Sequence, residues 1–533
     1  MIILFQILLK YIFSRKTGQI LVVFQNNYEL RGGGGFITQL LDISIGKGRI
    51  KMNFRHDYQD LQGTATIKPP ATVKKYLGLN HWYLRDSNLF GDFAENAKSI
   101  GYNYSSIYKN QPVVAVFAVN FTLIEQIMSI VGNIKLNAQT LDSQNIFSVL
   151  TDAVSSVDRH DLNALNNRKN LLKELFHDLS GKIFLSPWKW PALARLFKES
   201  LKTKDFQIHF FELSVQKKLI AKELIETFSS NKSTDCLAIV ENNFLGLKTN
   251  RYLRRLVFHD VQFFFDSKNK RLSDAIINVK IRTEHFGSFN YPLSGTYQSV
   301  TSVFIPKLAQ NLKILSTGIN FDTNKTKDFL NLTYHQLLAV GQSSEITFQY
   351  SLPAKLFLDC QYTFRYIKQS GVQNEHIFET VNYPDQYKLQ ANNDQLLVRE
   401  SKLFVNHDNL DRSYDYAVNG KFHHQSPRIF FHEIISPSVI QIRFNEPVFF
   451  KNSTQTSRNI KVVEKQTGDG IPVKSLKFTT DNRHLLIDVP TLPQENERFY
   501  HVLLSNIQNY AGVSLDNAPK KVTVVYRPKF FQH

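Results

Sequence analysis

The spacing of the apolar residues changes abruptly after Thr227, and this change constrains the fold more than any other feature of the sequence. Before it, apolar residues recur at helical spacing, as at Leu172, Leu175 and Leu179. From Leu237 onward, short apolar runs alternate with turn residues, and no clear long amphipathic helix interrupts them. Short strands in succession are typical of β-sandwiches. We therefore predict a multidomain chain in which an α/β domain precedes β-sandwich modules.

Strands and helices are expected to alternate in the first half. Ile20–Phe24 and Val113–Val119 are continuous apolar runs bounded by polar residues, the pattern of buried strands. Phe36–Ile45 and Arg49–Phe54 are expected as further strands. Asn120 is a suitable N-cap for a helix with apolar residues on one face. This order predicts a mixed sheet with helices packed on it.

The chain is too long for one hydrophobic core. It has 533 residues, of which 42% are hydrophobic, whereas single cores stop growing at roughly 250–300 residues. We predict an α/β domain at residues 1–230, a β-sandwich at 231–350, a β-rich module at 351–425 and a last sandwich at 426–533.

The formal net charge of +18 favours anionic partners. The basic residues are spread along the chain without a helix-turn-helix, RNP or zinc-finger pattern, so we do not expect nucleic acid as a partner. If the protein lies outside the cytoplasm, a phosphate-bearing cell-wall glycopolymer or an anionic lipid such as a polyprenyl phosphate fits better. The alternative is a basic surface that binds only water and salt.

The first residues leave two alternatives open. Met1–Phe13 is apolar but is interrupted by Lys10, and a membrane-spanning helix needs about 20 apolar residues. The segment also lacks the basic start and the small-residue cleavage site of a signal peptide. Either the chain is soluble and intracellular, or a membrane helix lies upstream and is missing from this sequence.

The first candidate site is Arg31 with the glycines that follow it, Gly32, Gly33, Gly34 and Gly35. Consecutive glycines allow backbone N–H groups to converge on an anion, and an arginine can bind phosphate through two parallel hydrogen bonds. The alternative is a flexible connection between two strands.

Arg85 and Asp86 form the second candidate site. Together with Asp92 they could hold a substrate or Mg²⁺, which prefers oxygen ligands. The alternative is an ion pair beside a carboxylate at a helix N-terminus. Because ligands of open α/β sheets collect beyond the strand ends, we predict that Arg31, the glycine loop 32–35, Arg85 and Asp86 form one anion-binding site.

No resident metal or organic cofactor is expected from the sequence. The chain has no CxxC pair, no Cys/His cluster and no HExxH spacing, so neither a zinc site nor a metalloprotease centre is predicted. The two cysteines, Cys236 and Cys360, exclude a disulfide framework, and whether they pair stays open.

Three motifs resemble an uncharacterised bacterial cell-envelope family, domain of unknown function four-zero-one-two. They are Phe24–Arg31 with Gly34–Phe36, Leu84–Asn88 with Asp92 and Phe93, and Glu241–Asn243 with Gly246, Lys248 and Arg254. The resemblance covers about residues 18–350. It implies a membrane helix before the first strand, and hence an extracytoplasmic, membrane-anchored protein whose N-terminal part is missing here.

The first domain also resembles, more remotely, the LytR-CpsA-Psr phosphotransferases. The strand Val113–Val119, its helix and Gly132 follow their order, Arg55–Asp57 stands where they carry an Arg-Asp pair, and Asn167–Lys169 falls near their later arginines. The resemblance implies transfer of a polyprenyl-linked glycopolymer to the wall, with Mg²⁺. The aspartate that these enzymes place after their first arginine has no counterpart after Arg31, which puts metal-assisted transfer in doubt.

The last module resembles bacterial immunoglobulin-like surface domains. Val439–Val448 is similar to their early strand and turn, and Ser505–Gly512 to their closing segment. This resemblance implies a spacer or adhesive module without catalytic residues.

Two classes of function therefore compete. The protein either binds and scaffolds anionic envelope polymers, or it transfers a phosphoglycosyl group. A transferase needs its arginines, here Arg31, Arg55, Arg85 and Arg168, to converge on one apolar groove long enough for a lipid. Scattered arginines favour binding.

Overall fold

The structure is a computed structural model. It describes residues 2–56, 68–69, 71, 74–75, 78, 80–108, 112–136, 139–155, 162–230, 234–266, 271–291, 293–357, 359–385, 387–392, 396–422, 427–451, 459–493, 495–509, 512–515 and 520–528.

The α/β domain is built on one mixed five-stranded sheet in the order β3-β2-β1-β4-β7. The strands are β1 Gly18–Asn26, β2 Phe36–Gly46, β3 Arg49–His56, β4 Val113–Asn120 and β7 Phe206–Phe210. β1 pairs in parallel with β4 and antiparallel with β2. The predicted strands therefore lie in one sheet, and the α/β prediction is confirmed.

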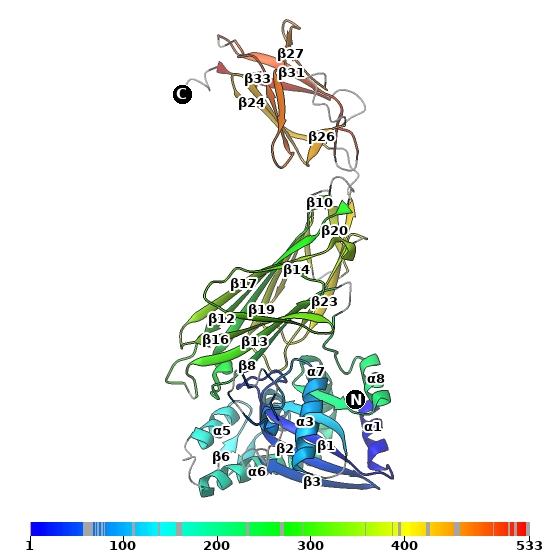
Figure 1. Cartoon of the computed structure of the whole chain (residues 1–533), viewed down its shortest axis with the longest axis vertical. Coiled ribbons are helices and arrows are strands. Elements are labelled where there is room, and N and C mark those ends of the chain that lie inside the picture. The colour runs from blue at the N-terminus through cyan, green and yellow to red at the C-terminus, as the bar shows by residue number, and fades with distance from the viewer. Residues whose placement is uncertain are drawn as a thin grey trace.

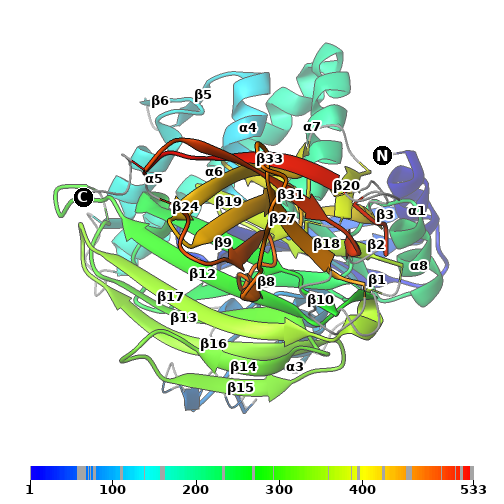
Figure 2. The ribbon, with the colours of Figure 1, turned by 90° about the horizontal axis from the view of Figure 1, so that it is seen from above.

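Helices cover both faces of this sheet, because β4 buries side chains on both sides. Val116 and Ala118 contact α3, whereas Ala115, Phe117 and Val119 contact the other helices. Figure 2 shows α4, α6 and α7 on one side and α3 on the other. The helices are α1 Ile2–Ile12, α3 Phe93–Ile107, α4 Phe121–Val131, α5 Ile146–Ser155, α6 Leu162–Leu185, α7 Trp190–Thr203 and α8 Leu213–Ala221, and a hairpin of β5 Ile134–Leu136 and β6 Gln139–Leu141 follows α4.

The N-cap prediction for α4 is only half right. Asn120 is the N-cap residue, but its side chain makes no capping hydrogen bond. Its amide instead donates to Ser370 Oγ at 3.1 Å, in the next domain. Asp92, by contrast, caps α3 by accepting a hydrogen bond from Ala94 N at 2.9 Å, as the alternative for this carboxylate predicts.

Residues 235–422 form one sandwich of two seven-stranded sheets. The first sheet is β15 Phe321–Lys325, β16 Phe329–Leu338, β13 Tyr297–Pro306, β8 Asp235–Asn243, β18 Gln361–Ile367, β23 Tyr414–Phe422 and β20 Tyr387–Ala391. The second is β14 Gln310–Ile314, β17 Ser343–Leu352, β12 Ala275–His285, β9 Leu253–Gln262, β19 Glu375–Asn382, β22 Lys402–His407 and β21 Leu397–Arg399, and a short hairpin joins β10 Phe265–Asp266 to β11 Arg271–Leu272.

The structure does not divide this region at residue 350. β8 pairs with β18 and β9 pairs with β19, both in parallel, so the segments 231–350 and 351–425 contribute strands to both sheets. One hydrophobic core, from Leu237 to Val418, runs through both segments. They therefore form a single module, because their strands complete each other's sheets.

The last module has a core of its own, formed by residues 434–526. One sheet is β24 Ile429–Ser436, β25 Val439–Phe444, β30 His484–Asp488 and β29 Ser475–Phe478, and the other is β28 Gly470–Ile471, β27 Ile460–Glu464, β31 Arg498–Leu504 and β33 Lys520–Tyr526, with β26 Val448–Phe450 paired to β32 Ile507–Asn509. The α/β domain, the long sandwich and this module follow one another in a row (Figure 1).

None of the helices described is long and apolar enough to cross a bilayer. The helix α1 has 11 residues and packs Leu4 and Ile7 into the core of the α/β domain. A membrane helix upstream of this sequence stays a prediction.

Candidate functional site

The loop from β1 to β2 lies where the α/β domain meets the long sandwich. Asn27 to Gly35 are all buried, although loops normally run over the surface. Two backbone hydrogen bonds close the loop, from Glu29 N to Asn26 O at 3.0 Å and from Phe36 N to Glu29 O at 2.8 Å. Because the sandwich covers the loop, its polar groups must find partners within the protein.

The glycine amides find these partners in neighbouring segments. Gly32 N donates to Asn242 Oδ1 at 2.9 Å, Gly33 N to Asn88 O at 2.7 Å, and Gly34 N to Arg31 O at 2.8 Å. A side chain at position 32 would place its Cβ 2.2 Å from Leu89 O. The glycines therefore allow close packing of two loops, and anion binding by their amides stays a prediction.

Arg31 and Arg85 each pair with a neighbouring carboxylate. Arg31 is buried, with Nη2 3.4 Å from Glu29 Oε1 and its guanidinium over the rings of Phe36 and Phe244. Arg85 Nε is 3.7 Å from Asp86 Oδ2.

The carboxylate of Asp86 is close enough to both arginines for their charges to change its pKa. Burial raises its pKa, and the positive charges of Arg31 and Arg85 both oppose this rise. The two motifs therefore share one electrostatic environment, in which the carboxylates of Glu29 and Asp86 face the two arginines.

Of the other predicted arginines, Arg55 does not join this group. Arg55 lies on β3, where Nη2 is 3.5 Å from Asp42 Oδ2 and the guanidinium lies over the ring of Tyr108. Tyr104 also donates to Asp42, at 2.5 Å, so Arg55 belongs to a separate cluster under α3. Arg168 lies in α6, but its side chain is outside the described residues, as is Asp57.

The first part of the third motif, Glu241–Asn243, meets the first motif at the end of β8. Asn243 N donates to Leu30 O at 2.9 Å, and Asn242 Nδ2 donates to Leu89 O at 3.2 Å. Asn250 Oδ1 accepts hydrogen bonds from Leu30 N and from Asn243 Nδ2. All three motifs thus meet in one hydrogen-bonded junction.

Gln369 completes this junction and was not singled out in the sequence. It follows β18, and its side chain bonds to both backbone groups of Glu241 and donates to Arg31 O at 3.0 Å. Ser370 Oγ donates to Lys204 O at 2.6 Å. The polar stretch Lys368–Gly371, directly after a buried strand, was the available signal.

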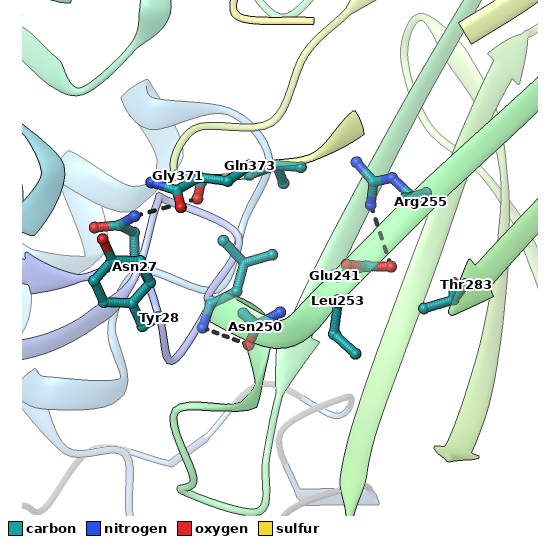
Figure 3. Close-up of a pocket in the computed structure, with 11 residues that line it drawn as sticks. Asn27, Tyr28, Glu241, Asn250, Leu253, Arg255, Thr283, Gly371 and Gln373 are labelled. Carbon is teal, nitrogen blue, oxygen red and sulfur yellow. Dashed lines mark hydrogen bonds and ion pairs between the residues drawn. The ribbon is translucent and has the colours of Figure 1, made fainter. Parts of the chain in front are cut away.

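An internal cavity lies beside the junction (Figure 3). Asn27, Tyr28 and Gln373 line one side, and Glu241 and Arg255 the other. Its volume of about 20 Å³ admits about one water molecule. A lipid or a glycan does not fit there.

The charges beside this cavity are paired. Arg255 is buried, with Nη1 3.2 Å from Glu241 Oε1 and Nη2 2.5 Å from Glu375 Oε1. Burial alone would lower the pKa of Arg255, but the charges of Glu375 and Glu241 raise it well above its usual value. This cluster is a closed ion-pair network, not an open site.

No group of three or more His, Cys, Asp or Glu side chains that could hold a metal occurs within the described part of the chain. Cys236 and Cys360 are both free thiols, so they do not pair. A need for Mg²⁺ stays a prediction that depends on transferase activity.

Comparison of the sequence with models of known protein families gives one match. A family model described as "Protein of unknown function (DUF4012)" matches residues 16–154. This match lies within the α/β domain and supports the resemblance to that family over a shorter stretch than 18–350. No curated protein sequence matches the chain.

Solved structures give weak matches. B. subtilis TagV is 11% identical, covers 40% of this chain and 80% of its own, and has a TM-score of 0.24. The Lin1025 protein from Listeria innocua is 14% identical and covers 39% of this chain and 77% of its own, with a TM-score of 0.23. The N-terminal part of the bacterial S-layer protein SbsC is 18% identical with a TM-score of 0.17, and the match covers 19% of this chain and only 24% of that N-terminal part. TM-scores this low do not establish a common fold.

Proposed function

We propose that this protein is an extracytoplasmic component of the bacterial cell envelope that scaffolds and binds anionic wall polymers. The observation that carries the proposal is that all three sequence motifs meet in the buried junction between the α/β domain and the long sandwich. The most specific parts of the sequence thus serve to hold two modules in a fixed arrangement. A third module extends the row (Figure 1), as suits a spacer.

The net charge of +18 supports an anionic polymer as the ligand. An immunoglobulin-like character of the last module fits the same role, as a spacer between the binding part and its surroundings.

The location is tested by protease treatment of intact cells that carry the chain with a C-terminal epitope tag. We expect the tag to be digested while a cytosolic marker survives. A tag that survives in intact cells and disappears only after lysis would contradict the proposal.

The binding role is tested by cosedimentation with isolated cell wall, before and after removal of its anionic polymers. We expect sedimentation only with the untreated wall, and less of it as salt rises. Equal sedimentation with both walls would contradict an anionic ligand.

Phosphoglycosyl transfer is the competing function, and the proximity of Arg31, Arg85 and Asp86 is the observation in its favour. Against it, Arg55 pairs elsewhere and Arg31 is buried under the sandwich. Titration with a polyprenyl pyrophosphate separates the two functions at fixed ionic strength. If the protein is a transferase, Arg31→Ala and Arg85→Ala should each bind the polyprenyl pyrophosphate more weakly than wild type. If it is a scaffold, wild type and both variants should show no specific binding of this lipid.

A further inference from the structure

The end of the α/β domain remote from the long sandwich has two exposed features that the proposed function does not explain. We propose that this end, the distal end, docks on the surface of a bilayer that contains anionic phospholipid. The inference deepens the proposed function and rests on it, since an envelope protein has a membrane within reach.

The first feature is the aromatic corner, defined as Phe184, Leu185, Trp188 and Trp190, which runs from the end of α6 to the start of α7. These side chains are 80%, 77%, 72% and 49% exposed, respectively. The chain has only three tryptophans, and the third, Trp82, is buried. Two of the three tryptophans are thus exposed to solvent within one short turn. Burial of their apolar surface against a partner would be favourable.

Hydrogen bonds fix the corner to the body of the domain. Trp190 Nε1 donates to Ile183 O at 2.8 Å, and Lys189 Nζ donates to Val131 O at 3.1 Å, at the end of α4. Lys182 Nζ donates to Asn133 O nearby. The corner is therefore held in place by hydrogen bonds to α4 and to the residues that follow it.

The course of α4 and α7 places the corner at the distal end. α4 begins after Asn120 and α7 is followed by Lys204, and both of these residues bond to the sandwich segment 368–370. α7 has 14 residues and α4 has 11, so they extend roughly 21 Å and 16 Å away from the junction. Trp190, at the start of α7, lies at the far end of that length.

The second feature is the basic tip, defined as Phe13, Arg15, Lys16, Lys47, Arg49 and Ile50. All six are exposed. Lys47 N donates to Ser14 O and Gly48 N to Ile12 O, so the two segments lie side by side. The stretches 10–17 and 46–51 contain six basic residues and no acidic one.

The sheet register places the basic tip at the distal end too. Gly18 at the start of β1 pairs with Ile45, and Gln25 near its end pairs with Asn120 at the junction. The hairpin between β2 and β3 thus projects away from the sandwich, as Figure 1 shows for β3 and α1 at the lower end of the domain.

An anionic bilayer suits this combination better than the other occupants. Tryptophan is enriched at membrane interfaces, where its ring is buried and its N–H stays near water, and basic residues are attracted to anionic headgroups. A second copy of the chain would bring two basic tips together and repel. A glycan would stack on the tryptophans but would leave the apolar side chains of Leu185 and Ile50 exposed to solvent.

The test is cosedimentation of the full chain with phosphatidylcholine vesicles, with and without phosphatidylglycerol. We expect binding only with phosphatidylglycerol, a decrease with salt, and a blue shift of tryptophan emission on binding. Phe184→Ser with Trp188→Ser should weaken binding at least about tenfold. Lys47→Gln and Arg49→Gln should each weaken it roughly fivefold.

Matched controls come from the sandwich modules. Phe289→Ser and Phe430→Ser remove rings that are 75% and 70% exposed, and they should bind like wild type. Thermal unfolding checks that every variant is folded.

Several outcomes would overturn the proposal. The first is equal binding to vesicles with and without phosphatidylglycerol. The second is wild-type binding by the aromatic-corner variant or by the basic-tip variants. The third is that the corner mediates self-association or polysaccharide binding while the chain does not bind vesicles. Failure here would leave the protease result in cells unaffected, so the two proposals fail separately.

Discussion

The junction and the interior of the long sandwich both bury polar groups, but of different kinds. The junction is held mainly by neutral amides, such as those of Asn242 and Gln369, bonded to backbone groups. The sandwich interior holds ionisable groups, among them Arg255, His259 and Glu379, all buried. Neutral amides keep their hydrogen bonds at every pH, whereas ionisable groups do not. The comparison teaches that the amide contacts of Asn242 and Gln369 should not titrate, whereas the ionisable groups of the sandwich should make its stability depend on pH.

The second ionisable cluster of the sandwich surrounds Asp235. His259 Nε2 lies 3.4 Å from Asp235 Oδ2, and the hydroxyls of Tyr350 and Tyr362 donate to the same carboxylate at 2.9 and 2.6 Å. Burial opposes the charged form of His259, but the hydrogen bond and charge of Asp235 raise its pKa. Burial also raises the pKa of Glu379, to about 7.

The largest expected effect is that of Arg255→Met. It leaves Glu241 and Glu375 buried without their positive partner, which should lower the free energy of unfolding by about 3–5 kcal/mol. Urea unfolding at neutral pH measures this. Arg254→Met is the matched control, because Arg254 is 51% exposed beside Glu284 and should cost less than about 1 kcal/mol. Equal decreases in the free energy of unfolding of the two variants would contradict the prediction that the buried ion pairs of Arg255 contribute more than the exposed pair of Arg254.

The second effect is a dependence of stability on pH. The pKa of Glu379 rises from 4.5 to about 7 on folding, so its contribution to stability is complete below pH 4.5 and is lost as pH rises through about 7. The raised pKa of His259 acts in the same direction. The contribution of Glu379 to stability should fall by up to roughly 3 kcal/mol from acid to mildly alkaline pH. Glu379→Gln should flatten this slope, and a slope unchanged in the variant would assign it to other groups.

A smaller loss is expected at the junction. Asn242→Ala removes the acceptor of Gly32 N and the donor to Leu89 O, which should cost about 1–3 kcal/mol. The loss should be the same at pH values on either side of 7, in contrast to the sandwich. Asn324→Ala, on an exposed edge strand, should change stability by less than about 0.5 kcal/mol.

The smallest expected effect is a loss of stability as pH falls, in contrast to the loss as pH rises that Glu379 causes. Burial lowers the pKa of His209 on β7 from 6.5 to about 4, so the unfolded chain binds a proton that the folded chain does not. This group's contribution is lost as pH falls below 6.5, by about 1 kcal/mol near pH 5.5. His209→Gln should remove this acid sensitivity, which equilibrium unfolding at two acidic pH values would reveal.

The sequence predicted what depends on local pattern. β1, β4 and α4 follow from apolar runs and helical spacing. The shared anion-binding site of Arg31, Arg85 and Asp86 stays a prediction, although Arg31 is close enough for its charge to act on Asp86. Four glycines in a row fit an anion site and a flexible connection between two strands equally well. No local pattern shows that Leu89 and Asn242 lie against them.

The division of the sandwich could not be predicted for a different reason. β8 pairs with β18 across more than a hundred residues, and no local pattern records which distant strand a buried strand joins. Gln369 was missed likewise, since its role depends on contacts with Arg31 and Glu241.

The two central parallel pairs have a consequence for synthesis. β8 and β9 are the central strands of the two sheets, and each gains its second neighbour only when β18 and β19 exist. A nascent chain that ends near residue 352 therefore carries two apolar strands with open edges, which are templates for aggregation. β18 ends at Ile367 and β19 at Asn382, so both central strands have their second neighbour only after residue 382 has been synthesised. Until then the unfinished sandwich is prone to aggregation.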